Sequence, residues 1–283
     1  MNYRAWQLKN ADTAGESALL AAGYGPLLAR VLACRGIAQP QAAAALLEEE
    51  PPLSDPFLLK DMDKAVARIQ QAIENGETIV IFGDYDVDGV SATAILYECL
   101  TNLGAQVRCK LPTREGGGYG LNRETLQKLA DKGYKLIVTV DNGISAIEEA
   151  DLAAELGIEL VITDHHLPGD EIPDTLVVNP NQRGDTFPSK SLAGVGVIFY
   201  VLIAVRSALR AKGAYPNGKQ PNLQHLIDLV ALGTVADVVP LDRNNRILVS
   251  KGLDSIRAGK MQPGVSALLS VAGKNAHRIS AND

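Results

Sequence analysis

The 283-residue sequence has few cysteines and no long apolar run, and both absences exclude classes of protein. Its three cysteines (Cys34, Cys99 and Cys109) are odd in number and follow no metal-ligand spacing, which favours a reducing compartment. The longest apolar run, Leu192 to Val205, has 14 residues and two glycines, whereas a membrane span needs about 20. The N-terminal residues MNYRAWQLKN lack the apolar segment of a secretory signal. We therefore expect a cytoplasmic protein without membrane contact.

The sequence also lacks an excess of positive charge. Its net charge of −6 argues against a protein that binds nucleic acid by electrostatics alone. The distribution is uneven, because residues 241–283 contain seven Lys and Arg against three Asp, while residues 1–240 contain 20 against 30. A cluster of acids that binds divalent cations would account for part of this acidic excess.

Short apolar runs alternate with amphipathic segments from about residue 60 onward. Runs of this kind without in/out alternation are typical of parallel strands that are covered on both faces. The predicted strands are 78–82, 107–111, 136–140, 160–163 and 176–178, and the predicted helices are 63–75, 90–103, 123–132, 146–156, 192–211 and 222–235. The pattern therefore predicts an α/β fold with a parallel sheet and helices on both faces. We expect a helical N-terminal segment (1–55), a catalytic domain (56–241) and a helical linker (242–283).

Acidic and imidazole side chains follow three of these strands. Asp84, Asp86 and Asp88 come after the first strand, Asp141 after 136–140, and Asp164-His165-His166 after 160–163. A fourth acidic position, Asp237, follows the apolar segment LIDLVALGTVA. Because ligands of open α/β sheets bind at the carboxyl ends of neighbouring strands, about 4.8 Å apart, these acids can converge on one site.

Turn and capping chemistry is the ordinary alternative for any one of these acids. Three acids within five residues resist that alternative, because they would repel each other without a cation. Two adjacent histidines add imidazole ligands, whereas the isolated His225 and His277 are interpreted as structural. Together these residues predict a carboxylate and imidazole site for two divalent ions, Mn²⁺ or Mg²⁺, of the kind that supports phosphoryl displacement.

Two glycine-containing segments lie near this predicted site. Residues 111–122 (LPTREGGGYGLN) carry four glycines within five residues, so their backbone can approach a ligand closely, and Arg114 offers a donor fork suited to phosphate. A flexible surface loop is the alternative for this segment. Residues 192–196 (LAGVG) lack the lysine of a phosphate-binding P-loop, and we interpret them as close helix packing beside the site.

Six motifs in one order carry a resemblance to a known family. They are GDYDVDG, PTREGGGYGLN, VTVDNGIS, ITDHHLPG, SLAGVGV and ALGTVADVVPL. They resemble the DHH phosphoesterase superfamily, and within it the RecJ-type branch of single-strand-specific 5′→3′ DNA exonucleases. The resemblance covers about residues 56 to 260.

The resemblance implies a role for each motif residue. Direct metal ligands would be Asp86, Asp88, Asp141, His165 and Asp237, with Asp84 in or next to that set. Asp141 would bridge the two ions, His166 would contact the scissile phosphate, and Asp164 would orient the histidines. Arg114, His166 and Asn122 would bind substrate phosphate. Of these, His166, Asp141 and Asp164 are the expected catalytic residues.

The expected function is that of a Mn²⁺-dependent, or Mg²⁺-dependent, exonuclease core acting in recombination and repair. Its substrate would be single-stranded DNA with a 5′ end, and its partners a single-strand-binding protein and a helicase. RecJ-type proteins continue into a smaller DHH-associated domain and an OB-type domain, so we expect this chain to be the catalytic part of a longer protein. Two alternatives remain: a DHH hydrolase of oligoribonucleotides, cyclic dinucleotides or pyrophosphate, and a non-catalytic scaffold of a replication complex.

Overall fold

The chain forms two compact units, residues 1–52 and 53–283, in a computed structural model that describes residues 8–47, 52–112, 120–215 and 220–283. The first unit holds three short helices, α1 (Thr13–Ala21), α2 (Pro26–Cys34) and α3 (Pro40–Leu47). Leu19, Ala29, Leu32 and Ala43 form its small apolar core. Gly15 is buried, and a Cβ at this position would lie 2.5 Å from the Cβ of Ala38. This close packing therefore requires glycine.

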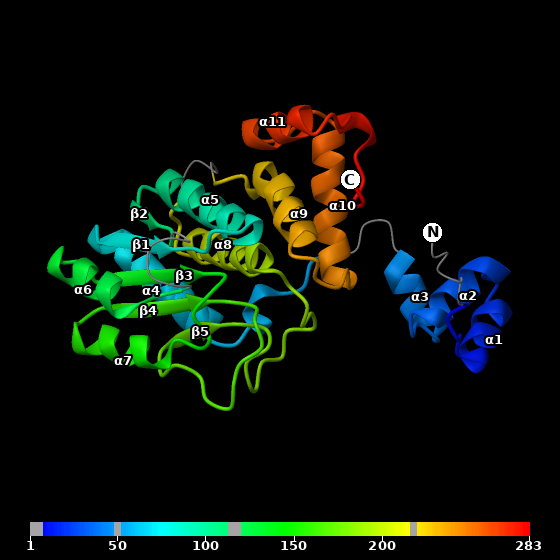
Figure 1. Cartoon of the computed structure of the whole chain (residues 1–283), viewed down its shortest axis with the longest axis horizontal. Coiled ribbons are helices and arrows are strands. Elements are labelled where there is room, and N and C mark those ends of the chain that lie inside the picture. Colours follow the sequence, from blue (N-terminus) through cyan, green and yellow to red (C-terminus); the bar gives the residue numbers. More distant parts are fainter. Residues whose placement is uncertain (1–7, 48–51, 113–119, 216–219) are drawn as a thin grey trace, which may run out of the picture. The chain divides into compact units, whose positions relative to one another are not determined.

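The second unit is built on a five-stranded parallel sheet (Figure 1). The strands lie in the order β2-β1-β3-β4-β5. Their bounds are β1 (Thr78–Phe82), β2 (Gln106–Lys110), β3 (Leu136–Val140), β4 (Glu159–Thr163) and β5 (Leu176–Val178). Because all five strands run in one direction, their carboxyl ends share one edge of the sheet. The predicted parallel α/β fold is confirmed.

Helices cover both faces of this sheet (Figure 1). The larger core joins Ile79 and Ile81 of β1 to α4 (Met62–Asn75), α5 (Val87–Asn102) and α8 (Gly194–Ala211). On the opposite face, Val80 and Phe82 pack with α6 (Arg123–Asp131) and α7 (Ile147–Glu155). Burial of both faces of β1 explains why the strand reads as a continuous apolar run.

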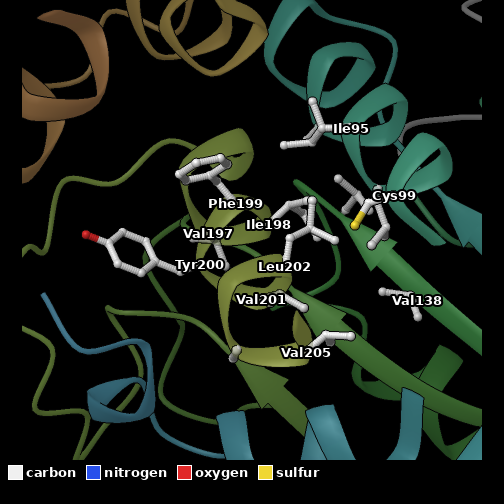
Figure 2. Packing of buried hydrophobic residues seen from close by; sticks show 14 of the residues in the cluster. Ile95, Cys99, Val138, Val197, Ile198, Phe199, Tyr200, Val201, Leu202 and Val205 are labelled. Atoms are coloured by element: carbon white, nitrogen blue, oxygen red, sulfur yellow. The ribbon is translucent and has the colours of Figure 1, made fainter. Parts of the chain in front are cut away.

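Helix α8 is the centre of the larger core. Figure 2 shows Ile198 and Leu202 of this helix among Ile95 and Cys99 of α5 and Val138 of β3. By length and composition α8 could cross a membrane, but 67% of it is buried inside this protein. Its apolar character therefore reflects its burial in the larger core.

The C-terminal part of the second unit is helical. A 3₁₀ turn (Leu223–Leu226) leads into α9 (Ile227–Ala236), and α10 (Arg243–Arg257) packs along α9, where a Cβ at Gly252 would lie 2.3 Å from the Cβ of Ala231. Helix α11 (Pro263–Val271) follows. The predicted helix 222–235 is therefore divided into two elements. The three-part domain division expected from the sequence remains a proposal, although α10 belongs to the same compact unit as the sheet.

Candidate metal centre

Three aspartates occupy the turn from β1 into α5. Asp84 follows the strand and is buried, and its Oδ1 accepts a hydrogen bond from the amide of Tyr85 (2.6 Å). Asp86 caps the N-terminus of α5, because its Oδ1 accepts from the amide of Gly89 (2.8 Å). A Cβ at Gly89 would lie 2.6 Å from the Cβ of Asp84, so glycine is needed there for the turn to close. Capping and turn hydrogen bonds thus fix the positions of Asp84 and Asp86.

Asp88 ties the first turn of α5 to the start of α8. Its Oδ2 accepts from the amide of Gly194 (2.6 Å) and its Oδ1 from the amide of Val195 (2.8 Å), and the residue is 1% exposed. A Cβ at Gly194 would lie 2.7 Å from the Cβ of Asp141. The predicted close helix packing at 192–196 is therefore confirmed, and the reason is the approach of α8 to two carboxylates.

Asp141 follows β3 in a left-handed backbone conformation (φ 62°). Aspartate tolerates this conformation better than most residues. The next residue, Asn142, is buried and donates from Nδ2 to the carbonyls of Val140 (2.8 Å) and Phe82 (3.3 Å), which ties the ends of β3 and β1 together. Asp141 is thereby fixed at the centre of the strand-end edge with 1% exposure.

The two histidines after β4 are held by the Asp164 carboxylate and by two asparagine side chains. Asp164 accepts from the backbone amides of His165 (2.7 Å) and His166 (3.1 Å), and its Oδ1 lies 2.7 Å from Nδ1 of His166. Asn181 donates to the carbonyl of His165 (2.6 Å), and Asn179 donates to the carbonyl of His166 (2.9 Å). Both histidines therefore have fixed backbones.

Asp237 reaches the same place from the C-terminal end of α9. Its Oδ2 lies 3.6 Å from Nε2 of His165. The same Nε2 lies 3.0 Å from Oδ1 of Asp141 and 3.9 Å from Oδ2 of Asp88. His165 is therefore the point at which side chains from α5, β3 and α9 meet.

Three groups of side chains present ligand atoms that lie within 4.8 Å of one another. The groups are Asp84, Asp86 and Asp141; Asp88, His165 and Asp237; and Asp141, His165 and His166. Asp141 belongs to the first and third groups, and His165 to the second and third. The structure therefore brings each carboxylate and imidazole expected as a metal ligand into at least one of these groups, and the contact between Asp141 and His165 joins the groups.

Without a cation, this arrangement raises the pKa of several members. Burial, and then the charge of Asp141, raises the pKa of Asp88 to about 7, and burial raises the pKa of Asp141 to about 6. Burial also raises the pKa of Asp237. Burial lowers the pKa of His165, but its contact with Asp141 and the charges of Asp88 and Asp237 outweigh this effect and raise it to about 9. The pKa values of the three acids are thus raised mainly by burial, and the pKa of His165 is raised by the carboxylates around it.

Unsatisfied buried atoms show that the residues fit a divalent cation. Oδ1 of Asp141 and Nε2 of His165 are fully buried, and neither makes a well-directed hydrogen bond to a described residue. Buried polar atoms of this kind are rare unless they have a ligand or a functional role. Carboxylate oxygens with a minority of imidazole are the ligand set of Mn²⁺ and Mg²⁺ sites.

Asp164 differs from the other acids of the site. Burial acts to raise its pKa, but hydrogen bonds from His166 and from the Ile144 and His166 amides outweigh burial, so its pKa is lowered. Its Oδ2 accepts from the amide of Ile144 (2.9 Å). Asp164 is therefore an anion whose oxygens face the chain, and it belongs to none of the three ligand groups among the described residues.

Two further residues, Arg114 and Asn122, are predicted to bind phosphate. Arg114 lies outside the described residues. Asn122 caps the N-terminus of α6, with its Oδ1 accepting from the amide of Thr125 (2.9 Å). Sequence reasoning missed Asn179 and Asn181. Their one signal was the Asn-Pro-Asn sequence after β5, which is also ordinary turn chemistry.

Comparison with known proteins agrees with this geometry. Residues 78–234 match the DHH family, N-terminal domain. The single-stranded-DNA-specific exonuclease RecJ of Escherichia coli is 45% identical over 272 residues, which cover 95% of this chain and 47% of that protein. RecJ of Bacillus subtilis is 41% identical over 88% of this chain and 30% of that protein. The chain spans about half the length, or less, of these curated relatives.

Solved structures give the same result. RecJ from Thermus thermophilus in complex with Mn²⁺ superimposes with a TM-score of 0.73 at 32% identity, over 93% of this chain and 36% of that one. A second structure, of exonuclease RecJ bound to manganese, has a TM-score of 0.70 at 36% identity, over 81% of this chain and 55% of that one.

Proposed function

Because this chain belongs to the DHH family, we propose that it is the catalytic core of a metal-dependent exonuclease that hydrolyses single-stranded DNA from a 5′ end. The observation that carries the proposal is the meeting of Asp141 and His165 between two groups of ligand atoms at the carboxyl edge of the sheet. The relatives named as single-stranded-DNA-specific exonucleases support the choice of substrate.

Two divalent ions, Mn²⁺ or else Mg²⁺, are the cofactors that we propose for this site. Asp84, Asp86 and Asp141 would hold one ion, and Asp88, His165 and Asp237 would hold the other, with Asp141 as the bridging carboxylate. When bound, such ions stabilise the charge of a phosphoryl group and lower the pKa of water. Solved relatives with Mn²⁺ and with Mg²⁺ support this choice of metal.

His166 is the proposed contact to the scissile phosphate. Its Nδ1 faces Asp164, which leaves Nε2 on the opposite edge of a half-exposed ring. The Asp164 hydrogen bond raises the pKa of His166, so the ring is favoured as a donor to an anionic oxygen. Asp164 would act by orienting the ring rather than by touching substrate.

Arg114 and Asn122 remain proposed phosphate-binding residues. A single-strand-binding protein and a helicase remain proposed partners, and recombination and repair remain the proposed setting. The division into residues 1–55, 56–241 and 242–283 is likewise proposed.

One nuclease assay separates this proposal from its alternatives. The chain would be incubated with 5′-phosphorylated single-stranded DNA, duplex DNA, an RNA dinucleotide or pyrophosphate, each with Mn²⁺ or with EDTA. We expect Mn²⁺-dependent release of nucleotides from single-stranded DNA. Faster turnover of the dinucleotide or pyrophosphate would favour a small-substrate hydrolase, and no turnover of any substrate would favour a scaffold.

A further inference from the structure

A groove with several basic residues in its lining lies between the end of edge strand β2 and helix α6. It has a volume of about 380 Å³. Four cations and one acid line it: Lys110 at the end of β2, Arg123, Glu124 and Lys128 on α6, and Lys132 directly after α6. Figure 1 shows α6 on the side of the second unit away from α9 and α10. The acidic charge of the whole chain makes such a groove unexpected.

The charge of this region is opposite to that of the chain as a whole. Residues 106–112 and 120–135 contain six Lys and Arg against two Asp and Glu, while the chain has 27 against 33. Glu124 pairs with Lys128, and the hydrogen bond from Lys128, followed by the charges of Lys128 and Lys110, lowers the pKa of Glu124. Within the part of the chain that the structure describes, Lys110, Arg123 and Lys132 have no ion-pair partner. The groove therefore keeps a net positive charge.

The groove begins beside the candidate metal centre. Lys110 pairs in register with Phe82 of β1, and its carbonyl accepts from the amide of Gly83 (3.1 Å), which directly precedes Asp84. One strand spacing, about 4.8 Å, separates these backbones. A chain of phosphates that ends at the acids could thus continue into the groove.

Protection of the sheet edge is the ordinary explanation for cations on an edge strand. It accounts for Lys110 but not for Arg123, Lys128 and Lys132, which lie on a helix or directly after it. The groove lining described here includes no aromatic side chain. Cations without stacking rings suit the phosphates of a strand rather than its bases.

From these observations we propose that the groove between β2 and α6 holds the phosphodiester backbone of the strand whose end lies at the metal centre. This inference rests on the proposed function. It adds a surface for the uncleaved part of the strand, with Lys110, Arg123 and Lys132 as its principal contacts.

The test compares DNA binding by two double variants of the full chain. Lys110→Gln with Lys132→Gln removes two groove charges, and Lys212→Gln with Lys274→Gln removes two exposed charges elsewhere. Binding of a 3′-labelled single-stranded 20-mer is measured by fluorescence anisotropy in EDTA between 50 and 200 mM salt. Each lost phosphate contact flattens the plot of log K against log salt by about 0.7, so we expect binding about ten- to thirty-fold weaker and a slope flatter by about 1.4.

Hydrolysis of a dinucleotide provides the second measurement. A dinucleotide has one phosphodiester, which would occupy the metal centre and leave none for the groove, so its kcat and KM should be equal in the wild type and both variants. If the wild type neither binds nor cleaves single-stranded DNA, the proposed function itself fails. If the wild type binds DNA and the groove variant binds it as tightly as the control variant, the groove proposal is wrong. This is the result expected if the groove binds an acidic protein instead of DNA.

Discussion

Nε2 of His165 lies 3.0 Å from Oδ1 of Asp141, and this contact joins the two groups of ligand atoms at the strand ends. Replacing Asp141 should therefore disturb both proposed ion sites at once. Asp141→Asn is the suitable variant because asparagine keeps the size of the side chain and tolerates φ of 62°. We expect Mn²⁺-dependent hydrolysis of single-stranded DNA to fall at least about 100-fold.

The control for Asp141→Asn is Asp151→Asn, which neutralises an exposed acid on α7. It should retain wild-type turnover. Wild-type turnover by Asp141→Asn at saturating Mn²⁺ would contradict the assignment of Asp141 as a shared ligand.

Stability of the metal-free chain should fall as pH rises. Asp88 has a folded pKa of about 7 against an ordinary value of 3.8, so protonation of Asp88 stabilises the folded chain. This stabilisation is lost as pH rises from about 3.8 to about 7. His165 has a folded pKa of about 9 against 6.5, and its contribution is present below pH 6.5 and lost as pH rises through 9. Both effects have the same sign, because the Asp88 contribution is lost between about pH 3.8 and pH 7 and the His165 contribution between about pH 6.5 and pH 9.

Added Mn²⁺ competes with these protons, so its stabilising effect should increase with pH. Thermal unfolding would be followed at pH 6 and pH 8, with EDTA and with Mn²⁺. We expect the rise in Tm on adding Mn²⁺ to be larger at pH 8 by several degrees. An equal or smaller rise at pH 8 would show that these groups do not bind the metal.

Asn181 should control metal affinity more than stability. Its side chain donates to the carbonyl of His165 (2.6 Å), so Asn181→Ala frees the backbone of a proposed ligand. Loss of the hydrogen bond should cost about 1 kcal/mol of unfolding free energy, while Mn²⁺ affinity should fall about 10- to 100-fold. Calorimetric titration with Mn²⁺ measures the second effect. The control is Asn282→Ala, at an exposed position, which should leave Mn²⁺ affinity unchanged. Unchanged Mn²⁺ affinity in Asn181→Ala would exclude a positioning role for Asn181.

Gly194 should tolerate no side chain. Gly194 is the first residue of α8, and a Cβ there would lie 2.7 Å from the Cβ of Asp141. The amide of Gly194 also donates a hydrogen bond to Asp88. Gly194→Ala should lower the unfolding free energy by about 1–3 kcal/mol, the cost of overpacking, and should reduce turnover as well. Gly264→Ala is the matched control, because nothing lies within 4 Å of its added Cβ. Urea denaturation of both variants gives the comparison, and equal stabilities would contradict the close approach.

The sequence predicts the sheet and the acids well because both follow from simple rules. Continuous apolar runs predict buried parallel strands, and parallel strands bring Asp84, Asp141 and His165 to one edge. Other parts of the site depend on contacts between distant residues. The bonds from Asp88 to the start of α8 join positions 106 and 107 residues apart, and no local pattern specifies them. Asn179 and Asn181 carry the same sequence signal as an ordinary turn.

Asp237 lies at the C-terminal end of α9, and this position affects how strongly its carboxylate favours a nearby cation. A helix N-terminus carries partial positive charge, which favours the carboxylate of Asp86. A helix C-terminus carries partial negative charge, so Asp237 adds its own charge to carbonyls that already favour a cation, an effect of about 0.3–1 kcal/mol. An incoming ion therefore relieves more repulsion beside Asp237 than beside Asp86.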